Sequence, residues 1–163
     1  MPRLLSPLLG AVLAATALPA AAATVTIDLA TQRMHVDSAQ GTFDWPVSSA
    51  RAGYVTPTGT FQPERLAEVY HSKKYDNAPM PHAIFFYYGF AIHGTNEVRH
   101  LGHPASHGCI RLAPGNAAKL FNLVKAEGAT ITVTGTPPGQ APYAAVADAG
   151  SKPSGGFLSF LGF

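Results

Sequence analysis

The sequence predicts a mostly β domain with one main helix. Between residues 24 and 135, short apolar runs rich in Thr and Val alternate with Pro, Gly and Asp turns, which is typical of strands. Only one stretch repeats its apolar residues at the spacing of an amphipathic helix. The sequence shows no internal repeat, and its 163 residues fit one domain with flanking segments.

Residues 1–23 have the pattern of a cleavable export signal. Arg3 precedes an apolar run over residues 8–18, and small residues follow at 20–23. The run is shorter than the roughly 20 apolar residues that a membrane span needs. Because no cysteine follows the small residues, a lipid anchor on the mature chain is not expected. The sequence therefore predicts an exported protein that is not a lipoprotein.

The charge pattern argues against a nucleic-acid partner. The formal net charge of +2 falls to +1 once Arg3 leaves with the signal, and the remaining charges are mixed along the chain. Nucleic-acid-binding domains usually carry a basic patch or stripe. No block of Lys and Arg, and no basic–aromatic interleaving, is present.

The first half of the domain is predicted to form short strands. Residues 24–29 and 32–36 alternate apolar and polar side chains with period two, and residues 28–31 connect them as a hairpin. A third strand is expected at 43–48, where Pro46 favours a sheet edge or a bulge. The Thr-Pro-Thr-Gly-Thr-Phe stretch at 56–61 predicts a turn followed by a return strand.

The middle of the chain combines a long loop with two buried strands. Residues 62–81 are polar and irregular, and a loop of this length in a compact domain often forms a lid or wall over a site. Residues 83–88 and 90–92 are nearly continuous apolar runs, as in central strands that are buried on both faces. The second run places His93 at its C-terminal end.

The main helix is expected to begin at Asn116, which is a suitable N-cap residue. From Ala117 to Val124 the apolar residues recur at i, i+3, i+4 and i+7, and Gly128 supplies the stop. Residues 129–134 alternate as a last strand. Residues 136–163 are dominated by Pro, Gly, Ala and Ser and are predicted to form a flexible tail.

The only cysteine, Cys109, is the leading candidate for a nucleophile. An exported protein meets an oxidising compartment, where a lone thiol cannot form an intramolecular disulfide and is exposed to oxidation. A thiol with a pKa near ~8.5 is mostly protonated at neutral pH, so a nucleophilic cysteine needs a nearby base. The alternative is a small buried residue with no chemical role.

Two histidines are candidates for that base. His93 ends a central strand and is far enough from Cys109 in sequence for the chain to return on an adjacent strand. His107 lies two residues before Cys109, and an extended chain would put both side chains on one face. We favour His93 because a strand end fixes its geometry, and His107 would then shape the site or bind substrate.

Other residues near Cys109 are suited to acyl-transfer chemistry. Gly108 allows a sharp turn that aims backbone N–H groups at an oxyanion. Arg111 is placed to hold a substrate carboxylate in a bidentate pair. Each residue also has a structural alternative: an ion-pair partner for Arg111, a plain turn residue for Gly108 and a satisfied polar group for His107.

A zinc site is the competing interpretation. Zinc accepts histidine nitrogen and cysteine sulfur, and several such residues crowd this region. Their spacing matches no HExxH or CxxC pattern, and Glu97 is the only acidic residue among them. We therefore expect neither a metal nor a cofactor. The candidate ligands are His93, His100, His103, His107 and Cys109.

Several motifs closely resemble the L,D-transpeptidase (YkuD-like) catalytic domain family. They are His-Gly-Thr at 93–95 and L-G-x-P-x-S-H-G-C-I-R-L at 101–112. The T-P-T-G-T-F stretch at 56–61 and the M-P-H-A-I-F-F stretch that begins the segment 80–95 are similar to the family as well. The resemblance covers roughly residues 24–135, essentially the whole predicted domain.

The resemblance implies a β-sandwich of mixed sheets with one packed helix and a cysteine-based site. Cys109 matches the nucleophile, His93 the base, and Gly94 the residue whose backbone carbonyl orients that base. His107, Gly108 and Arg111 match positions that line the pocket, to which we add three candidates. These are Ser106 of the cysteine motif for the oxyanion pocket, and Tyr75 and Met80 of the long loop for substrate contact.

The resemblance also implies a reaction on peptidoglycan in the periplasm. The thiolate attacks the bond between diaminopimelate and D-alanine in a stem tetrapeptide, and an amine resolves the thioester to give a 3→3 cross-link. Other expected acceptor amines include an outer-membrane protein or lipoprotein. The alternatives are a hydrolase of the same fold, either an L,D-carboxypeptidase or an amidase, that trims stems or releases wall-linked protein, and a non-catalytic wall-binding module.

Overall fold

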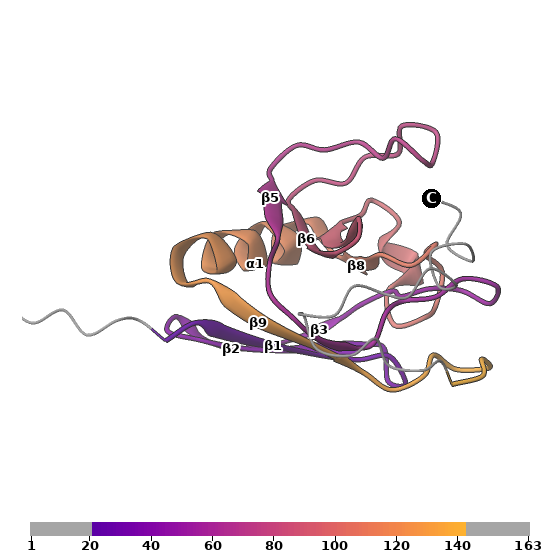
Figure 1. Ribbon diagram of the computed structural model, residues 1–163, viewed down its shortest axis with the longest axis horizontal. Helices are drawn as coiled ribbons and strands as arrows, with labels where there is room; N and C mark the ends of the chain where they lie inside the picture. The colour runs from indigo at the N-terminus through magenta and orange to yellow at the C-terminus, as the bar shows by residue number, and fades with distance from the viewer. Residues whose placement is uncertain (1–20, 143–163) are drawn as a thin grey trace, which may run out of the picture.

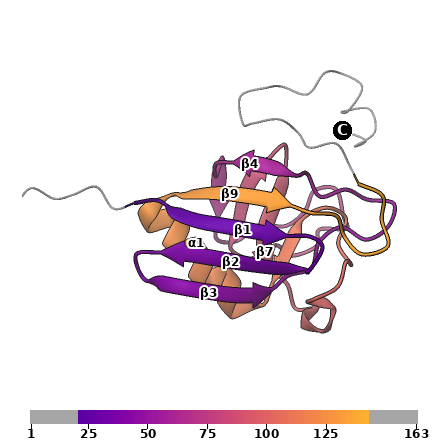
Figure 2. The same ribbon diagram turned by 90° about the horizontal axis from the view of Figure 1, so that it is seen from below.

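The computed structural model describes residues 21–142. Most of the predicted signal segment 1–23, and the predicted tail from residue 143 onward, lie outside the described residues. Two mixed sheets and one helix make up the domain (Figures 1 and 2), which confirms the predicted fold class. The first sheet has the order β3 (Gly41–Pro46), β2 (Arg33–Ser38), β1 (Ala23–Asp28), β9 (Ala129–Thr134), β4 (Gly59–Phe61). The second has the order β5 (Arg65–Ala67), β6 (Ala83–Tyr87), β7 (Phe90–Gly94), β8 (Ile110–Leu112).

The first sheet follows the alternation seen in the sequence. β1 and β2 pair as an antiparallel hairpin, and β1 pairs in parallel with β9 on its other side. The N–H of Ala30 donates to Asp28 Oδ1 at 2.9 Å, so the aspartate side chain stabilises the predicted hairpin turn. β3 lies at the edge of the sheet, as expected for a strand that ends in Pro46.

The second sheet is buried and carries the strand that ends in His93. Every residue of β6 and β7 is buried, as their continuous apolar sequences predict. β8 lies parallel to β7, with Ile92 opposite Ile110 and His93 opposite Arg111. This pairing brings the end of β7 beside the segment that precedes β8, which contains Cys109.

Helix α1 (Pro114–Glu127) packs between the two sheets, against β7, β6 and β1 (Figure 1). The predicted N-cap is wrong: Ala113 occupies that position without a side-chain cap, and the helix begins at Pro114. Proline suits the first helical position because its φ is preset and its missing N–H would have no partner there. Gly128 ends the helix at φ 72°, as predicted. Five helix residues enter the core: Ala117, Leu120, Phe121, Leu123 and Val124.

Three short elements were not predicted from the sequence. They are β5, β8 and the 3-10 turn η1 (Val98–His100), each of three residues. The expectation that residues 62–81 are irregular throughout is therefore wrong at β5. A three-residue strand has no period to detect, because it spans little more than one alternation.

The rest of the long loop is an ordered excursion above the second sheet (Figure 1). Its two arms are joined by hydrogen bonds from Ser72 N to Ala78 O at 2.9 Å and from Met80 N to Tyr70 O at 2.8 Å. Residues 68–82, called the lid below, therefore have backbone support of their own. Across residues 21–142, no helix combines the length and apolar content that crossing a bilayer requires.

Candidate active site

The candidate site lies on the face of the second sheet that points away from the main core. Ile92 and Ile110 belong to the main core, and the residues that alternate with them face the opposite side. Cys109 packs on that side against a small cluster that includes Ala91 and Phe85. Ala91 and His93 are two residues apart on β7 and therefore share this face. The strand thus puts the imidazole of His93 on the same face as the thiol.

His93 is buried, and its orientation is fixed by its neighbour. Nδ1 lies 2.8 Å from the backbone carbonyl oxygen of Gly94, and since a carbonyl only accepts, Nδ1 carries the proton. Nε2 therefore has a free lone pair. Burial, together with the charge of Arg111, lowers the pKa of His93 to about 4, although the hydrogen bond to Gly94 acts in the opposite direction.

Gly94 is held in a space that has no room for a side chain. A Cβ at this position would lie 3.1 Å from Cγ of Pro81 and 3.3 Å from Cβ of Ala117. The N–H of Gly94 donates to the carbonyl of Pro81 at 2.8 Å. Contacts with the base of the lid and with α1 therefore fix the peptide group that orients His93.

Cys109 is partly exposed as a residue, but its sulfur lies among apolar atoms. Burial raises the pKa of the thiol, while a backbone hydrogen bond from Ala91 and the charge of Arg111 act to lower it. At neutral pH the thiol is protonated and the imidazole of His93 is neutral. These shifts favour a neutral thiol and a neutral imidazole over a preformed ion pair.

The segment before Cys109 turns sharply. Gly108 has φ +133°, and a Cβ there would collide with the ring of Phe90 and lie 2.8 Å from the carbonyl oxygen of Val55. Ser106 supports the turn, because its Oγ donates to the carbonyl of Cys109 at 2.6 Å and accepts from the N–H of Gly108 at 3.0 Å. The extended conformation assumed for His107 and Cys109 is therefore wrong.

His107 lies in an aromatic and cationic surround. Its ring stacks on Tyr75 at 4.4 Å and meets Tyr54 edge-on at 4.6 Å. Arg51 Nη2 lies 2.6 Å from His107 Nε2, and since a guanidinium only donates, Nε2 is the acceptor. Burial and the charges of Arg51 and Arg111 lower the pKa of His107. This nitrogen is occupied, which favours His93 over His107 as the base.

Arg111 is engaged in an ion pair within the domain. Its Nη1 donates to Glu97 Oε2 at 2.8 Å, and its side chain is 19% exposed. The structural alternative considered for this residue is therefore present in the fold. Its proposed contact with a substrate carboxylate stays a prediction, and the guanidinium would have to share its donors with Glu97.

The lid brings both of its predicted residues to the site. Tyr75 stacks on His107, and burial raises the pKa of its phenol. Met80 is buried in the apolar cluster that Cys109 packs against. The residues that the sequence interpretation missed are Arg51, Tyr54, Thr56 and Glu97. Thr56 opens the T-P-T-G-T-F stretch, which the sequence predicts as a turn, and Glu97 stands out in the sequence only as the acidic residue among the candidate zinc ligands.

Three of the four histidines proposed as zinc ligands have other neighbours. His93 bonds to Gly94, His107 accepts from Arg51, and His100 lies 3.5 Å from Glu97. Within residues 21–142, no three His, Cys, Asp or Glu side chains are grouped as a metal site requires. The zinc interpretation therefore has no ligand set in this part of the chain.

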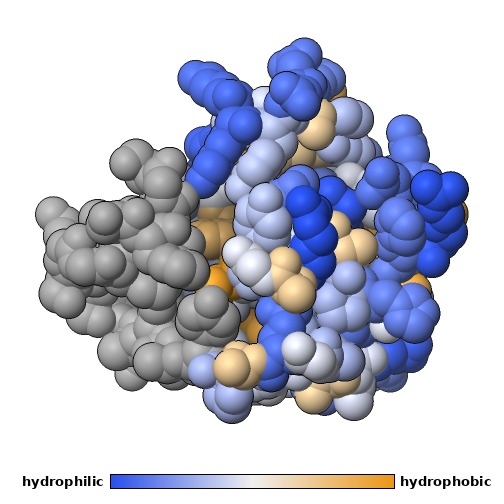
Figure 3. Space-filling view, turned by 90° about the vertical axis from the view of Figure 1, so that its right-hand side faces the viewer, coloured by the Kyte–Doolittle hydropathy of each residue, from blue (hydrophilic) through white to orange (hydrophobic). Residues whose placement is uncertain are grey.

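Figure 3 shows the end of the molecule on the right of Figure 1, where hydrophobic patches lie between mainly hydrophilic side chains.

These contacts define a β-sandwich domain with a lone cysteine on the same sheet face as a buried, oriented histidine. The family model YkuD, described as the L,D-transpeptidase catalytic domain, matches residues 22–139. The chain belongs to this family, so the resemblance seen in its motifs is confirmed.

Solved structures of L,D-transpeptidases share the fold. One from Stackebrandtia nassauensis is 30% identical with a TM-score of 0.65, covering 73% of this chain and 58% of that chain. One from Mycobacterium smegmatis is 25% identical with a TM-score of 0.62, covering 70% and 59%. L,D-transpeptidase 3 from Mycobacterium tuberculosis, solved with a faropenem-derived adduct, is 19% identical with a TM-score of 0.60, covering 69% and 60%. The matches span about three-fifths of these relatives' lengths, and no curated protein matches the chain.

Proposed function

We propose that the protein is a cysteine L,D-transpeptidase that acts on peptidoglycan stem tetrapeptides through a thioester. One observation carries the proposal: His93 Nδ1–H is bonded to the Gly94 carbonyl, which leaves Nε2 free on the same sheet face as Cys109. A buried base with a fixed tautomer beside a thiol is the arrangement that nucleophilic catalysis requires. A module that only binds the wall has no need of it.

The first half-reaction forms the acyl-enzyme. Cys109 Sγ attacks the carbonyl of the L-centre of diaminopimelate while Nε2 of His93 takes the thiol proton. The resulting oxyanion is stabilised by a backbone N–H of the turn. The intermediate collapses with cleavage of the C–N bond, and the imidazolium returns its proton to the departing amine of D-alanine.

The second half-reaction regenerates the thiol. An acceptor amine, proposed here to be the side-chain amine of another stem, attacks the thioester while His93 removes its proton. Collapse breaks the C–S bond and leaves a 3→3 cross-link. Water in place of the amine would give the stem tripeptide as a free acid, which is the hydrolase alternative. No contact in the described residues favours a protein acceptor.

Product analysis with purified protein and a defined tetrapeptide tests the reaction. We expect release of D-alanine together with a cross-linked dimer, both identified by mass spectrometry. Tripeptide acid without dimer would identify the hydrolase. Neither product, at several pH values, would contradict the proposal of a catalytic domain.

A covalent probe tests the nucleophile separately. A penem or carbapenem should add the mass of one drug molecule, since a protein of the same fold was solved with a faropenem-derived adduct. Cys109→Ala should abolish the adduct and retain the circular dichroism spectrum. Chelation with EDTA should leave peptide turnover unchanged, whereas iodoacetamide should stop it with one label on Cys109. An adduct that persists in Cys109→Ala would contradict the assignment.

The proposed location is the periplasm, reached through the signal in residues 1–23. The support is the sequence pattern of Arg3, the apolar run and the small residues that follow. N-terminal sequencing of the protein from a periplasmic extract should find a mature chain that lacks this segment. An intact N-terminus on cytoplasmic protein would contradict it.

A further inference from the structure

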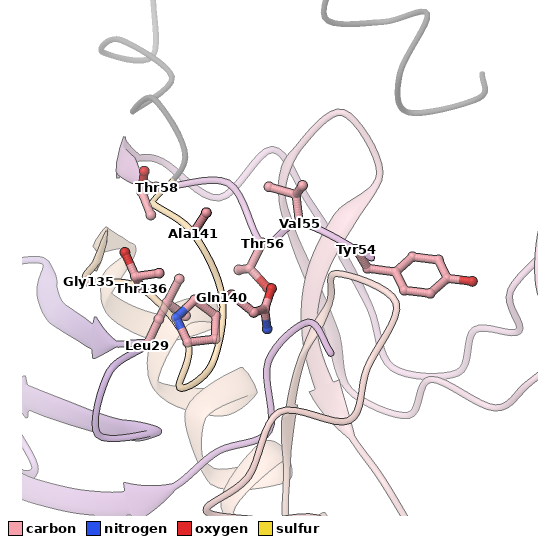
Figure 4. A pocket seen from close by; sticks show the side chains of 10 residues that line it. Leu29, Tyr54, Val55, Thr56, Thr58, Gly135, Thr136, Gln140 and Ala141 are labelled. Atoms are coloured by element: carbon pink, nitrogen blue, oxygen red, sulfur yellow. The ribbon is translucent and has the colours of Figure 1, made fainter. Parts of the chain in front are cut away.

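We propose that Thr56 is a positioning residue that orients the peptide group carrying the oxyanion-binding N–H of Cys109. The inference rests on the proposed function and adds a residue to its machinery. Thr56 lies in the loop before β4, 52 residues before the peptide that it contacts, and its side chain is buried. Figure 4 shows it beside Gln140, whereas the ring of Tyr54 points away.

The hydroxyl of Thr56 has a defined direction. Its Oγ1 accepts the N–H of Ala50 at 3.0 Å and lies 2.8 Å from the carbonyl oxygen of Gly108. Because that carbonyl only accepts, the hydroxyl proton points at it. The carbonyl of Ala50 in turn accepts from Gln140 Nε2 at 2.8 Å. The Thr56 hydroxyl is therefore held by the N–H of Ala50, and Gln140 in turn holds the carbonyl of Ala50.

A hydrogen bond that fixes the Gly108 carbonyl also fixes the direction of the Cys109 N–H in the same peptide group. In a planar trans peptide the C=O of Gly108 and the N–H of Cys109 point in opposite directions. No cis peptide bond occurs in the described residues. A bond on the carbonyl side therefore directs the Cys109 N–H away from Thr56. Glycine at 108, with φ +133°, has the rotational freedom to misplace this group if the bond is lost.

The polar backbone groups on either side of the Cys109 N–H already have partners. The N–H of Gly108 donates to Ser106 Oγ at 3.0 Å, and the carbonyl of Cys109 accepts from the same oxygen at 2.6 Å. Among the described residues, the N–H of Cys109 has no acceptor. It is the donor next to the sulfur that remains available, which fits it to receive the charge that develops when the thiol attacks a carbonyl.

This assignment predicts different effects on two reactions of the same thiol. Acylation by a β-lactam or a peptide places negative charge on a carbonyl oxygen and needs the N–H. Alkylation by iodoacetamide forms the S–C bond as the C–I bond breaks, with iodide leaving, and develops no oxyanion. The alkylation rate therefore reports on the thiol and on folding, and the acylation rate reports on the oxyanion donor as well.

The experiment compares both rates in Thr56→Val, Thr56→Ser and Thr58→Val, the last being a matched change in the same loop. We expect Thr56→Val to slow acylation by faropenem roughly tenfold to a hundredfold, somewhat less than the loss of a whole oxyanion donor. Its alkylation rate should stay within about twofold of the unmodified protein. With peptide substrate the loss should fall on kcat rather than KM. Thr56→Ser should restore acylation, and Thr58→Val should leave both rates unchanged.

Two results would overturn the assignment. One is normal acylation of Thr56→Val, and the other is an equal fall of both rates, which would mean that Thr56 acts on the thiol or on the fold. If Thr56→Val does not fold, Thr56→Ala removes the same hydroxyl with less bulk and is measured in the same way. Failure of the unmodified protein to acylate would instead count against the proposed function, so the two ideas fail separately.

Discussion

At the scale of single residues, the site assigns different tasks to two histidines that the sequence alone left as rivals. His93 shares the sheet face of Cys109, and His107 lies two residues before it; burial lowers the pKa of both histidines. Their ring nitrogens distinguish them. His93 has its Nδ1 bonded and its Nε2 free, whereas the Nε2 of His107 accepts from Arg51. His107 is therefore suited to shape the pocket with Tyr75 and Tyr54.

The first prediction follows from this difference. His93→Ala should slow acylation of Cys109 by on the order of 10²-fold or more, because the base is lost. His107→Ala should slow it less, through loss of the stacking that positions Tyr75. His71→Ala, in the exposed part of the lid, is the control and should be neutral. Stopped-flow measurement of β-lactam acylation compares all three. Normal acylation in His93→Ala with slow acylation in His107→Ala would reverse the assignment of the base.

At the scale of elements, the parallel pair β7–β8 and the turn before β8 create the site together. The pairing sets His93 beside Arg111, and the turn at Gly108 brings Cys109 to the same face. Loop residues 50–56 close against the turn from the other side, through Thr56 and the carbonyl of Val55. The turn therefore tolerates little change in shape or volume.

The second prediction concerns Gly108→Ala. The left-handed backbone there costs an L-residue about 1–3 kcal/mol, and the collision with Phe90 adds an overpacking cost of similar size. We expect a loss of at least about 2 kcal/mol in the free energy of unfolding, measured by urea denaturation. Gly102→Ala separates the two causes, because it has φ +87° but nothing within 4 Å of the new Cβ. Equal losses in the two variants would mean that the collision is relieved.

The elements also show what the sequence can and cannot predict. β1, β2, β6, β7 and α1 were predicted because their apolar patterns are long enough to define a period. β5, β8 and η1 were missed because three residues define none. The start of α1 was misplaced because Asn116 is a good cap by type, whereas Pro114 fits the first turn through its backbone.

The residues of the candidate site likewise divide into those that the sequence could predict and those that it could not. Cys109, His93 and Gly108 belong to a contiguous motif or follow a strand, so sequence reasoning could single them out. The contacts from Arg51, Tyr54 and Thr56 depend on a loop more than 50 residues away in the chain, and Glu97 pairs with Arg111 across a turn. No spacing rule predicts such contacts, because they are set by how the loops pack.

At the scale of the whole molecule, the buried imidazole couples the site to folding stability. His93 has a pKa of about 4 in the folded chain, against 6.5 for a free histidine. Between these values the unfolded chain binds a proton that the folded chain does not. The stability that a neutral His93 contributes is therefore complete above pH 6.5 and is lost as the pH falls toward 4.

The last prediction is the size and the origin of this loss of stability at acidic pH. A difference of about 2.5 pKa units corresponds to about 3 kcal/mol, so the free energy of unfolding should fall by roughly that amount between pH 6.5 and 4. Urea denaturation at a series of pH values measures it. In His93→Gln, whose side chain cannot titrate, the free energy of unfolding should change much less with pH over this range. The upper half of this pH window is diagnostic, because carboxyl groups protonate mainly below pH 5.

His35→Gln is the matched control. Asp44 raises the pKa of His35, so protonation of His35 adds to the stability of the folded protein as the pH falls. Removing His35 therefore cannot reduce the loss of stability at acidic pH. An unchanged slope in His93→Gln would mean that His93 is not a buried neutral imidazole, and the general-base role assigned to it would lose its electrostatic basis.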